Sequence, residues 1–434
     1  MFELFFIIAI AIFIGFLATL IFERTRISQV IILILFGFVL GPVLHVVDVS
    51  PDSVIVSLLP FLATLALIVL LFDAGLMIDV FSVANAIPRS TVFTFLVFTI
   101  SVLLVAAFCS LILGWPILHG VLLGSVVGGT SSAIVIAMVE RARITKEARS
   151  LLTVESTITD ALCIIVAVIA IQLIVSNQAP EITALINMFL SSFSLAIIFG
   201  VVSAVIWIFA IERTSMVKYA YMLTLALVLG LFAVTEALKA NGGIAVFFFG
   251  MVLGNAKELG KLLRFRKEVT VHPNIRLFQE EITFFVRTFF FVYIGLLLSP
   301  GYFSPVILAI SLVLLALFIA SRWIVQKAIL THLTLKDRNV IVAMLPRGLA
   351  AAVLATMPLS SGIAIPDFQQ IVFVVILLSN IAATIGIFVY DRETKPKHPP
   401  KPEEVLKQAL EEPESEPKPG AEEERPDSSE EDSS

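Results

Sequence analysis

Long apolar stretches separated by short polar connections run through most of this sequence and leave few folds open to it. A helix needs about 20 apolar residues to cross the hydrocarbon core of a bilayer. Hydrophobic residues make up 59% of the chain and charged residues 15%, against about 45–50% and about 25% in a soluble domain. We therefore predict an all-α polytopic membrane protein with about 13 transmembrane helices. The stretches lie at roughly 2–22, 28–47, 53–77, 86–113, 116–139, 148–175, 183–211, 216–238, 241–256, 274–298, 303–330, 339–358 and 367–390.

Positive charges in the connections fall almost entirely on one side of this arrangement. Sixteen lysines and arginines lie in connections that follow odd-numbered stretches, and only Lys239 lies in the opposite set. Membrane proteins keep such charges in the cytoplasm. The bias predicts a multi-pass protein of the cell membrane with its N-terminus outside and its C-terminus in the cytoplasm. The sixteen are Arg24, Arg26, Arg89, Arg141, Arg143, Lys146, Arg149, Arg213, Lys218, Lys257, Lys261, Arg264, Arg266, Lys267, Lys336 and Arg338.

The composition changes after Tyr390. Residues 391–434 contain 15 acidic and 7 basic residues together with many prolines and serines. Such a stretch buries too little apolar area to offset the entropy of ordering. We therefore predict a transmembrane domain at 1–390 and a disordered acidic cytoplasmic tail at 391–434. The mixed basic and apolar stretch 257–272 predicts a helix lying on the cytoplasmic membrane surface.

Patterns typical of enzymes and of bound cofactors are missing from the sequence. Cys109 and Cys163 lie in apolar stretches and are too few for a disulfide framework. The sequence has no Cys/His metal-ligand spacing and no G-x-x-x-x-G-K-[ST] loop, which argues against ATP-driven transport within this chain. We expect no enzyme activity, no cofactor and no nucleic-acid partner.

Charges inside the apolar stretches are the most informative residues, because each one is costly in hydrocarbon. The stretch 148–175 contains Glu155 and Asp160. Asp160 lies about 12 residues in, about 18 Å along a helix that crosses about 30 Å of hydrocarbon, which places it near the midplane. Ser156 shares its helix face, whereas Glu155 points toward a different neighbour. Asp160 can therefore face a cavity while Glu155 faces a packed helix.

A second charged site is expected where a helix is interrupted. In the stretch 339–358, Pro346 and Gly348 flank Arg347, which predicts a break in the helix. An unpaired arginine is hard to sustain at this depth, and Glu155 is the partner we expect for it.

The stretch 116–139 predicts a matching interruption, because Gly128 and Gly129 precede three hydroxyls, Thr130, Ser131 and Ser132. Broken helices are tolerated at membrane depth where they line a cavity, and their ends and freed carbonyls can bind ions. The two interrupted stretches are seven apart, so they run in opposite directions. They fit an inverted repeat of stretches 1–6 and 8–13, which favours a secondary transporter over a bundle of anchors.

For four further charged residues in the apolar stretches, the sequence gives weaker evidence of function. Arg287 fits a functional role and a structural role at the end of a broken helix equally well. For the acids Asp73 and Glu236 we expect packing or gating rather than direct ion binding. Arg322 lies close enough to the cytoplasmic end of its stretch to extend its guanidinium to the interface.

Five motifs occur in order at family-like spacing: RISQVIILILFGFVLGP at 26–42, LFDAGLMID at 71–79, ESTITDA at 155–161, NGGIAVFFFGMVLGN at 241–255 and LPRGLAAAV at 345–353. In these the chain resembles the cation:proton antiporter superfamily, on its sodium/proton exchanger (NhaP-like) branch, over residues 1–390. The resemblance implies an inverted-repeat antiporter fold with two interrupted crossing helices. It also implies a homodimer in the lipid bilayer that exchanges Na⁺ or Li⁺ for H⁺. A core of stretches 3–6 and 10–13 would move against a dimerising scaffold.

The resemblance also implies roles for single residues. Asp160 would bind either Na⁺ or H⁺, never both. Neutral oxygens around the cation would come from four residues, and Glu155 with Arg347 would form a structural ion pair. Arg287 and Asp73 are accessory candidates. The four neutral ligands are Ser156, Thr159, Thr130 and Ser131.

Two positions depart from the family pattern and bear on the transported ions. The family's T-D-P is Thr130-Ser131-Ser132 here, and the Asn before the aspartate is Thr159. Both weaken the argument for Na⁺ and leave K⁺/H⁺ antiport open. With one titratable acid at the site, electroneutral one-for-one exchange is expected. From a different class, an ion channel or a membrane sensor is the alternative, although the sequence shows no continuous polar pore face and no folded cytoplasmic domain.

Overall fold

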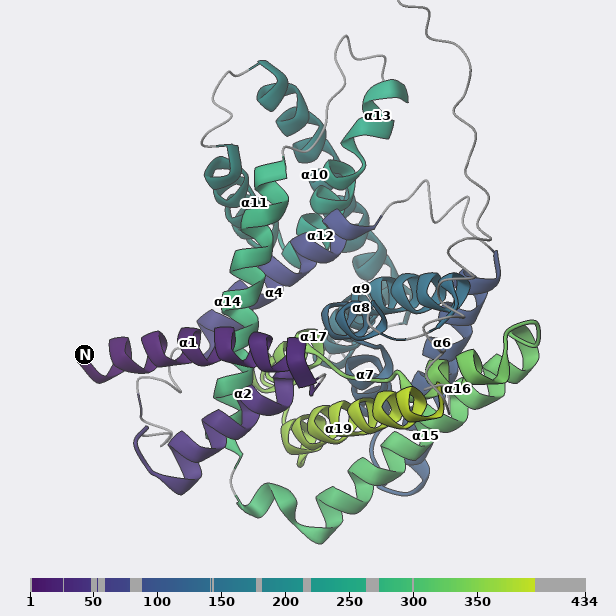
Figure 1. Ribbon diagram of the computed structural model, residues 1–434. Coiled ribbons are helices and arrows are strands. Elements are labelled where there is room, and N and C mark those ends of the chain that lie inside the picture. Colours follow the sequence, from purple (N-terminus) through teal and green to yellow (C-terminus); the bar gives the residue numbers. More distant parts are fainter. Residues whose placement is uncertain are drawn as a thin grey trace, which may run out of the picture. The chain divides into compact units, whose positions relative to one another are not determined.

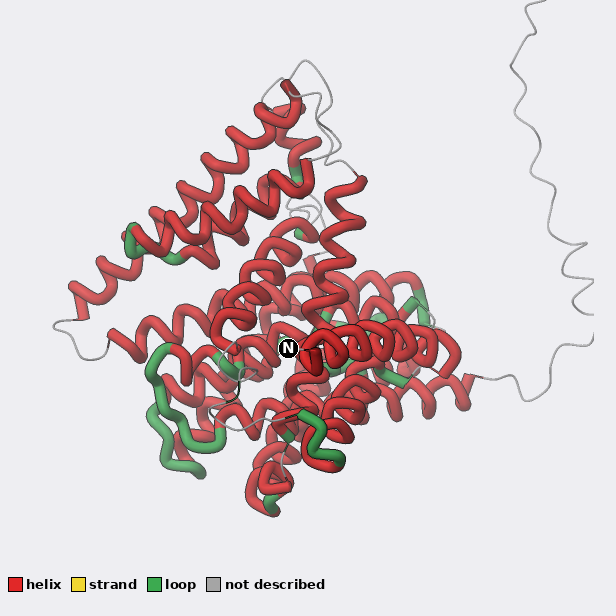
Figure 2. The backbone as a smooth tube through the Cα atoms, turned by 90° about the vertical axis from the view of Figure 1, so that its left-hand side faces the viewer, coloured by secondary structure: helices red, strands yellow, loops and turns green. Residues whose placement is uncertain are grey.

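The structure, a computed structural model, describes residues 2–25, 27–47, 53, 59–78, 88–140, 142, 144–176, 182–213, 220–262, 273–298 and 300–394. Within these residues the chain forms helices and loops and no strand (Figure 2). The chain divides into the units Met1–Asp391 and Arg392–Ser434. The predicted tail from residue 395 onward lies outside the described residues, as do residues 263–272 of the predicted surface helix, so both stay predictions.

Each predicted apolar stretch coincides with one helix or with a helix that is interrupted (Figure 1). Among the residues that the structure describes, eight segments are long and apolar enough to cross a membrane, and Gln29–Val43, Gly242–Gly254 and Leu349–Ser360 are shorter apolar helices. The all-α, polytopic membrane fold is thus confirmed. The elements in order are α1 (Phe2–Thr25), α2 (Gln29–Phe38) with a π-helical turn at Val39–Val43, α4 (Leu59–Met77), α6 (Pro88–Leu111), α7 (Ile117–Gly128), α8 (Ser132–Val139), α9 (Lys146–Ser176), α10 (Ile182–Arg213), α11 (Ala220–Ala237), α12 (Gly242–Gly254), α13 (Ala256–Leu262), α14 (Pro273–Leu297), a 3₁₀ turn at Pro300–Phe303, α15 (Pro305–Ile329), α16 (Leu335–Ala343), α17 (Leu349–Leu354), α18 (Met357–Ser360) and α19 (Phe368–Thr394).

Glycines bring two pairs of helices into backbone contact. A Cβ on Gly37 of α2 would overlap the Val292 carbonyl of α14, and a Cβ on Gly250 of α12 would lie 2.5 Å from the Phe72 carbonyl oxygen of α4. Transmembrane helices associate closely where small residues allow their backbones to approach. Close backbone packing therefore holds the pairs α2/α14 and α4/α12 together, in addition to contacts between apolar side chains.

These two helix pairs are copies of one arrangement. The sequence FGFVLG at 36–41 recurs as FGMVLG at 249–254. Gly41 approaches the Leu296 carbonyl as Gly254 approaches that of Leu76. Each pair joins the second predicted stretch of one half to the third stretch of the other half. The inverted repeat that the sequence predicted from its two interrupted helices is thus visible in packing elsewhere in the fold.

The same packing corrects the expected division into a moving core and a scaffold. The third and tenth stretches, α4 and α14, were assigned to the core, yet their most extensive contacts are with α12 and α2. The helices around the interrupted segments, α6 with α7, α7 with α9 and α6 with α15, pack among themselves. Because α4 and α14 interlock with α12 and α2 through glycines, we group them with the scaffold.

We expect Gly250→Ala to lower the midpoint of thermal unfolding, because its methyl group meets backbone that cannot move aside; overpacking costs about 1–3 kcal/mol. Gly230→Ala in α11 is the matched control, since a Cβ there would meet nothing within 4 Å. Unfolding of both variants is followed in detergent. Equal midpoints for Gly250→Ala and Gly230→Ala would contradict the backbone contact.

Candidate ion-binding site

Two membrane helices are interrupted, and their interruptions lie next to each other. Residues 129–131 separate α7 from α8, and residues 344–348 separate α16 from α17. The Ser131 amide donates a hydrogen bond of 2.9 Å to the Pro346 carbonyl oxygen. A Cβ on Gly348 would overlap the Ser131 side chain, so only glycine allows this approach. The two predicted interruptions are confirmed, and the unwound segments touch each other.

Side chains from the next long helix hold each unwound segment. The Thr130 amide donates to Thr159 Oγ1 at 3.1 Å, and the Arg347 amide donates to Ser379 Oγ at 3.1 Å. Asn380 Nδ2 also donates to the Arg347 carbonyl at 2.8 Å. A backbone group without a partner costs several kcal/mol in hydrocarbon, so these bonds make the interruptions possible. The bonds from α9 and α19 are equivalent in the repeat, with Thr159 matching Ser379.

Asp160 lies directly after Thr159 on α9 and faces the start of α8. Its Oδ2 accepts hydrogen bonds from the Ser132 amide at 2.8 Å and from Ser132 Oγ at 2.6 Å. The first amides of a helix have no partner within the helix and attract negative charge. Ser132 was not among the predicted ligands. The sequence signal for it was its position at the start of the helix that resumes after the predicted interruption.

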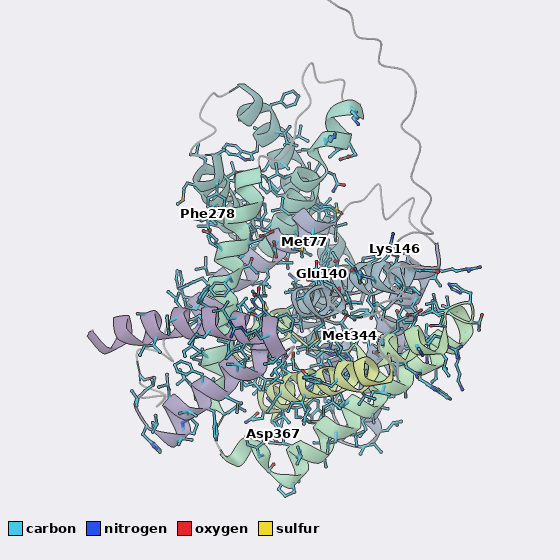
Figure 3. All side chains as sticks on the ribbon, viewed as in Figure 1. Met77, Glu140, Lys146, Phe278, Met344 and Asp367 are labelled. Atoms are coloured by element: carbon cyan, nitrogen blue, oxygen red, sulfur yellow. The ribbon has the colours of Figure 1, made fainter. Side chains whose placement is uncertain are left out.

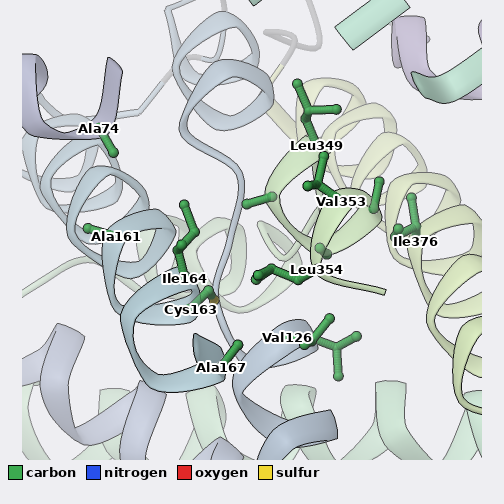
Figure 4. Close-up of a cluster of buried hydrophobic side chains, with 14 of the residues drawn as sticks. Ala74, Val126, Ala161, Cys163, Ile164, Ala167, Leu349, Val353, Leu354 and Ile376 are labelled. Atoms are coloured by element: carbon green, nitrogen blue, oxygen red, sulfur yellow. The ribbon is translucent and has the colours of Figure 1, made fainter. Parts of the chain in front are cut away.

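The carboxylate of Asp160 lines a cavity of about 50 Å³. Ser131, Asp73, Thr157 and Arg287 line the same cavity. Apolar side chains of α9 and α17, among them Ile164 and Leu349, also line it. Figure 4 shows these two side chains in a buried apolar cluster. A small space with two carboxylates, a guanidinium, hydroxyls and apolar walls has the chemistry to hold a partly dehydrated cation or a proton.

Asp73 connects this cavity to a larger one. The second cavity, of about 280 Å³, is lined by Asp73, Met77, Thr157, Gln279 and Glu280. It lies where α4 and α8 end and where α9 and α14 begin; Figure 3 labels Met77 at that end of α4. Asp73, expected to serve packing or gating, therefore lies between Asp160 and the larger space.

The predicted ion pair between Glu155 and Arg347 is wrong. Glu155 pairs with Arg322 of α15: Nη1 lies 2.5 Å from Oε1 and Nη2 lies 2.8 Å from Oε2. Arg322 Nε also donates to the Ile341 carbonyl of α16 at 2.8 Å. Both side chains are buried, at 1% and 2% exposure. Arg322 therefore does not extend to the interface as expected, because α15 turns it into the bundle, where a carboxylate meets its guanidinium in a two-pronged bond.

Arg347 is held by other groups. It is 2% exposed, its guanidinium carbon lies 4.4 Å from the centre of the Phe318 ring, and Nη1 donates to the Leu345 carbonyl at 3.3 Å. Such stacking on an aromatic face and bonds to freed carbonyls compensate part of the cost of burying a cation. The negative charge of Glu155 attracts Arg347, and the positive charge of Arg322 repels it. Arg347 thus remains a fixed positive charge in the second unwound segment.

Comparison with known proteins shows the family to which the chain belongs. The sequence matches the family described as "Sodium/hydrogen exchanger, transmembrane" over residues 8–390. The chain belongs to the sodium/hydrogen exchanger family. This membership confirms the resemblance seen in the motifs and places the protein among transporters embedded in the membrane by several passes.

Curated relatives of this exchanger carry two kinds of name. It is 25% identical over 375 residues to "Probable Na(+)/H(+) antiporter 2" of Methanocaldococcus jannaschii, covering 80% of this chain and 85% of that protein. It is 24% identical over 361 residues to "K(+)/H(+) antiporter NhaP2" of Shewanella sp. strain ANA-3, covering 80% of this chain but 60% of that protein. The exchanger therefore spans less than two thirds of that second relative.

Solved structures support the fold of this exchanger. The sodium proton antiporter MjNhaP1 from Methanocaldococcus jannaschii at pH 8 superposes with a TM-score of 0.69 at 20% sequence identity, covering 89% of this chain and 96% of that chain. The agreement spans nearly all of both chains, which confirms the antiporter fold.

The remaining predicted ligands of the exchanger lie at different distances from the cavity. Ser131 lines it, while the hydroxyls of Thr130 and Thr159 lie 3.4 Å apart behind it. Ser156 is fully buried and donates to the Thr153 carbonyl of its own helix at 3.1 Å. The structure thus groups Asp160 with Ser131, Ser132, Asp73 and Arg287, and ion binding by these residues stays a prediction.

For the corrected ion pair we expect strong coupling between Glu155 and Arg322 in a double-mutant cycle. Glu155→Gln or Arg322→Met alone leaves a buried charge without its partner and should cost about 3–5 kcal/mol, whereas the double variant should cost much less than the sum. Thermal unfolding in detergent measures all four forms. The matched cycle pairs Glu155→Gln with Arg347→Met, and stronger coupling there than with Arg322 would contradict the assignment.

Proposed function

We propose that this exchanger is a secondary antiporter that exchanges a monovalent cation, Na⁺ or Li⁺, for H⁺, and that the two ions compete for Asp160. The observation that carries the proposal is the carboxylate of Asp160 at the crossing of two unwound segments, in a cavity of about 50 Å³. Family membership and the name of the relative from Methanocaldococcus jannaschii support the choice of ions.

Competition follows from the charge in this cavity. A bare carboxylate surrounded by apolar walls is unfavourable, so Asp160 requires a counter-charge, which a proton or a cation can supply. Hydroxyl and carbonyl oxygens around it suit a hard cation. Either ion neutralises the site, and a neutral site can cross between the two faces of the membrane more readily than a charged one. The only resident chemistry needed is that of the chain itself, with no cofactor.

We further propose the sidedness and assembly that the sequence indicated. With the N-terminus outside and the C-terminus in the cytoplasm of a cell-membrane protein, the larger cavity at Glu280 faces the cytoplasm and gives ions access past Asp73 to Asp160. The helices around the unwound segments would move against the glycine-packed pairs α2/α14 and α4/α12 to expose Asp160 outward. The scaffold would form a homodimer, as the resemblance implies.

Electroneutral exchange is the stoichiometry that we propose. In the second half of the repeat Asn380 stands where Asp160 stands in the first, and it cannot titrate. Asp73 lines the same cavity, together with Arg287. We assign the exchanged proton to Asp160 because the start of α8 binds its carboxylate, and one proton would leave for each cation that enters.

Asp160→Asn should abolish exchange while the protein still inserts and folds. The amide of asparagine neither binds nor releases a proton near neutral pH, and burying it in hydrocarbon costs less than burying a carboxylate. The measurement is ΔpH dissipation in proteoliposomes with Na⁺, Li⁺ and K⁺ in separate arms. Asp367→Asn, which changes an exposed acid outside the cavity, is the control and should exchange normally. Exchange at the wild-type rate by purified Asp160→Asn would rule out the mechanism, and a wild-type response to K⁺ alone would make this protein a K⁺/H⁺ antiporter.

The reversal point tests stoichiometry. One-for-one exchange should show null flux when the Na⁺ and H⁺ gradients are equal and opposite, and a membrane potential of about 100 mV, set with K⁺ and valinomycin, should not move that point. The same K⁺ gradient without valinomycin controls for K⁺ transport. A reversal point that shifts with voltage in the wild type would reject electroneutral exchange, and recovery of a fixed point in Asp73→Asn would identify Asp73 as the second proton carrier.

A further inference from the structure

A third cavity lies away from the ion site, between α15, α16 and α19. Its volume is about 320 Å³. Most of the side chains around it are apolar, including Ile319 and Trp323 of α15, Val342 of α16 and Ala382 of α19. A water molecule needs only about 10–15 Å³ of such space, so the cavity has room for a much larger occupant.

One buried polar atom in this cavity is unsatisfied. Gln326 lines it and is 4% exposed, and its Oε1 has no hydrogen-bond partner among the described residues. An amide oxygen only accepts hydrogen bonds, and leaving it unpaired in an apolar setting is unfavourable. The occupant that this atom fits must therefore donate a hydrogen bond. Asn339 of α16 adds a second amide to the same wall.

Two lysines lie close to residues of the cavity wall, one by contact and one by its place in the sequence. Lys327 Nζ lies 3.6 Å from the centre of the Trp323 ring, and Lys336 is exposed on α16, one turn before Asn339. Both lysines lie near the ends of helices on the side where the sequence gathers its basic connections. Tryptophan and lysine together are typical of the boundary between hydrocarbon and headgroups. Basic pockets between transmembrane helices at that boundary bind anionic headgroups.

The surface of α15 beside the cavity is apolar and exposed. Leu312, Ile319 and Ile324 are 48%, 39% and 51% exposed. On a helix of a membrane protein these side chains meet acyl chains. An occupant can thus hold its charged end at the lysines and lay its apolar end along α15.

We propose that this cavity binds an anionic phospholipid with a hydroxyl-bearing headgroup, such as phosphatidylglycerol. Its phosphate lies at Lys327 and Lys336, a headgroup hydroxyl donates to Gln326 Oε1, and an acyl chain packs on Ile319 and Val342. Leu345 of the second unwound segment also lines the cavity, so the lipid braces the segment that carries Arg347. The site is separate from Asp160, and its occupancy does not depend on the proposed ion exchange.

Native mass spectrometry of the full chain in detergent tests the site with phosphatidylglycerol, phosphatidylcholine and phosphatidylethanolamine. Phosphatidylglycerol should bind at least several-fold more tightly than the other two. Gln326→Leu should weaken its binding about tenfold, the effect of losing about 1.4 kcal/mol. Lys327→Gln should weaken it as well, whereas Lys146→Gln, an exposed lysine on α9 outside the cavity, should leave binding unchanged.

Three outcomes would overturn the proposal. Equal binding of phosphatidylcholine removes the charge requirement, and equal binding of phosphatidylethanolamine shows that a donor without net negative charge suffices. Wild-type binding by both Gln326→Leu and Lys327→Gln places the lipid elsewhere. Because Lys327 is exposed, its variant is expected to fold even if Gln326→Leu does not, so one side of the site can always be tested.

Discussion

Backbone groups that leave a helix inside hydrocarbon must find partners within the protein, and the rest of this structure depends on how two unwound segments meet that demand. The segments satisfy part of it in each other, through the Ser131 amide and the Pro346 carbonyl. Thr159, Ser379 and Asn380 supply further partners from the helices that follow. Because Thr159 holds one segment, its neighbour Asp160 is carried to the start of α8, where Ser132 binds it. The position of Asp160 is thus a consequence of satisfying the backbone, and the proposed ion site depends on that position.

The two halves of the repeat share this scaffold but differ in charge. At equivalent positions the first half has Asp160 and the second has Asn380, whose amide binds the backbone of the unwound segment. The second segment also contains Arg347, a fixed cation stacked on Phe318. The pair of Glu155 and Arg322 is internally neutral and fastens α9 to α15. One half therefore has a carboxylate at this position, while the other has a neutral amide and an arginine in its unwound segment.

Much of this follows from the sequence, because the length of an apolar stretch and the position of glycine and proline are local properties. They predicted the helices, the interruptions at Gly129 and Pro346, and the inverted repeat. The partner of Glu155 depends on helix rotation and on neighbouring helices, which motifs and apolar stretches do not reveal, so from the sequence Glu155 is expected to pair with Arg347 and not with Arg322. For the same reason the sequence predicts only packing, gating or an accessory role for Asp73, which lines the cavity together with Asp160.

Proton release on cation binding tests most directly whether one carboxylate serves both ions. Titration calorimetry of the purified protein with Na⁺, repeated in buffers of different ionisation enthalpy near neutral pH, counts the protons released for each cation bound. Competition at Asp160 predicts a release that approaches one proton per Na⁺ as the pH is lowered, and neither binding nor release in Asp160→Asn. Binding of Na⁺ by the wild type without release at any pH in that range would contradict the account, because cation and proton would then occupy separate sites.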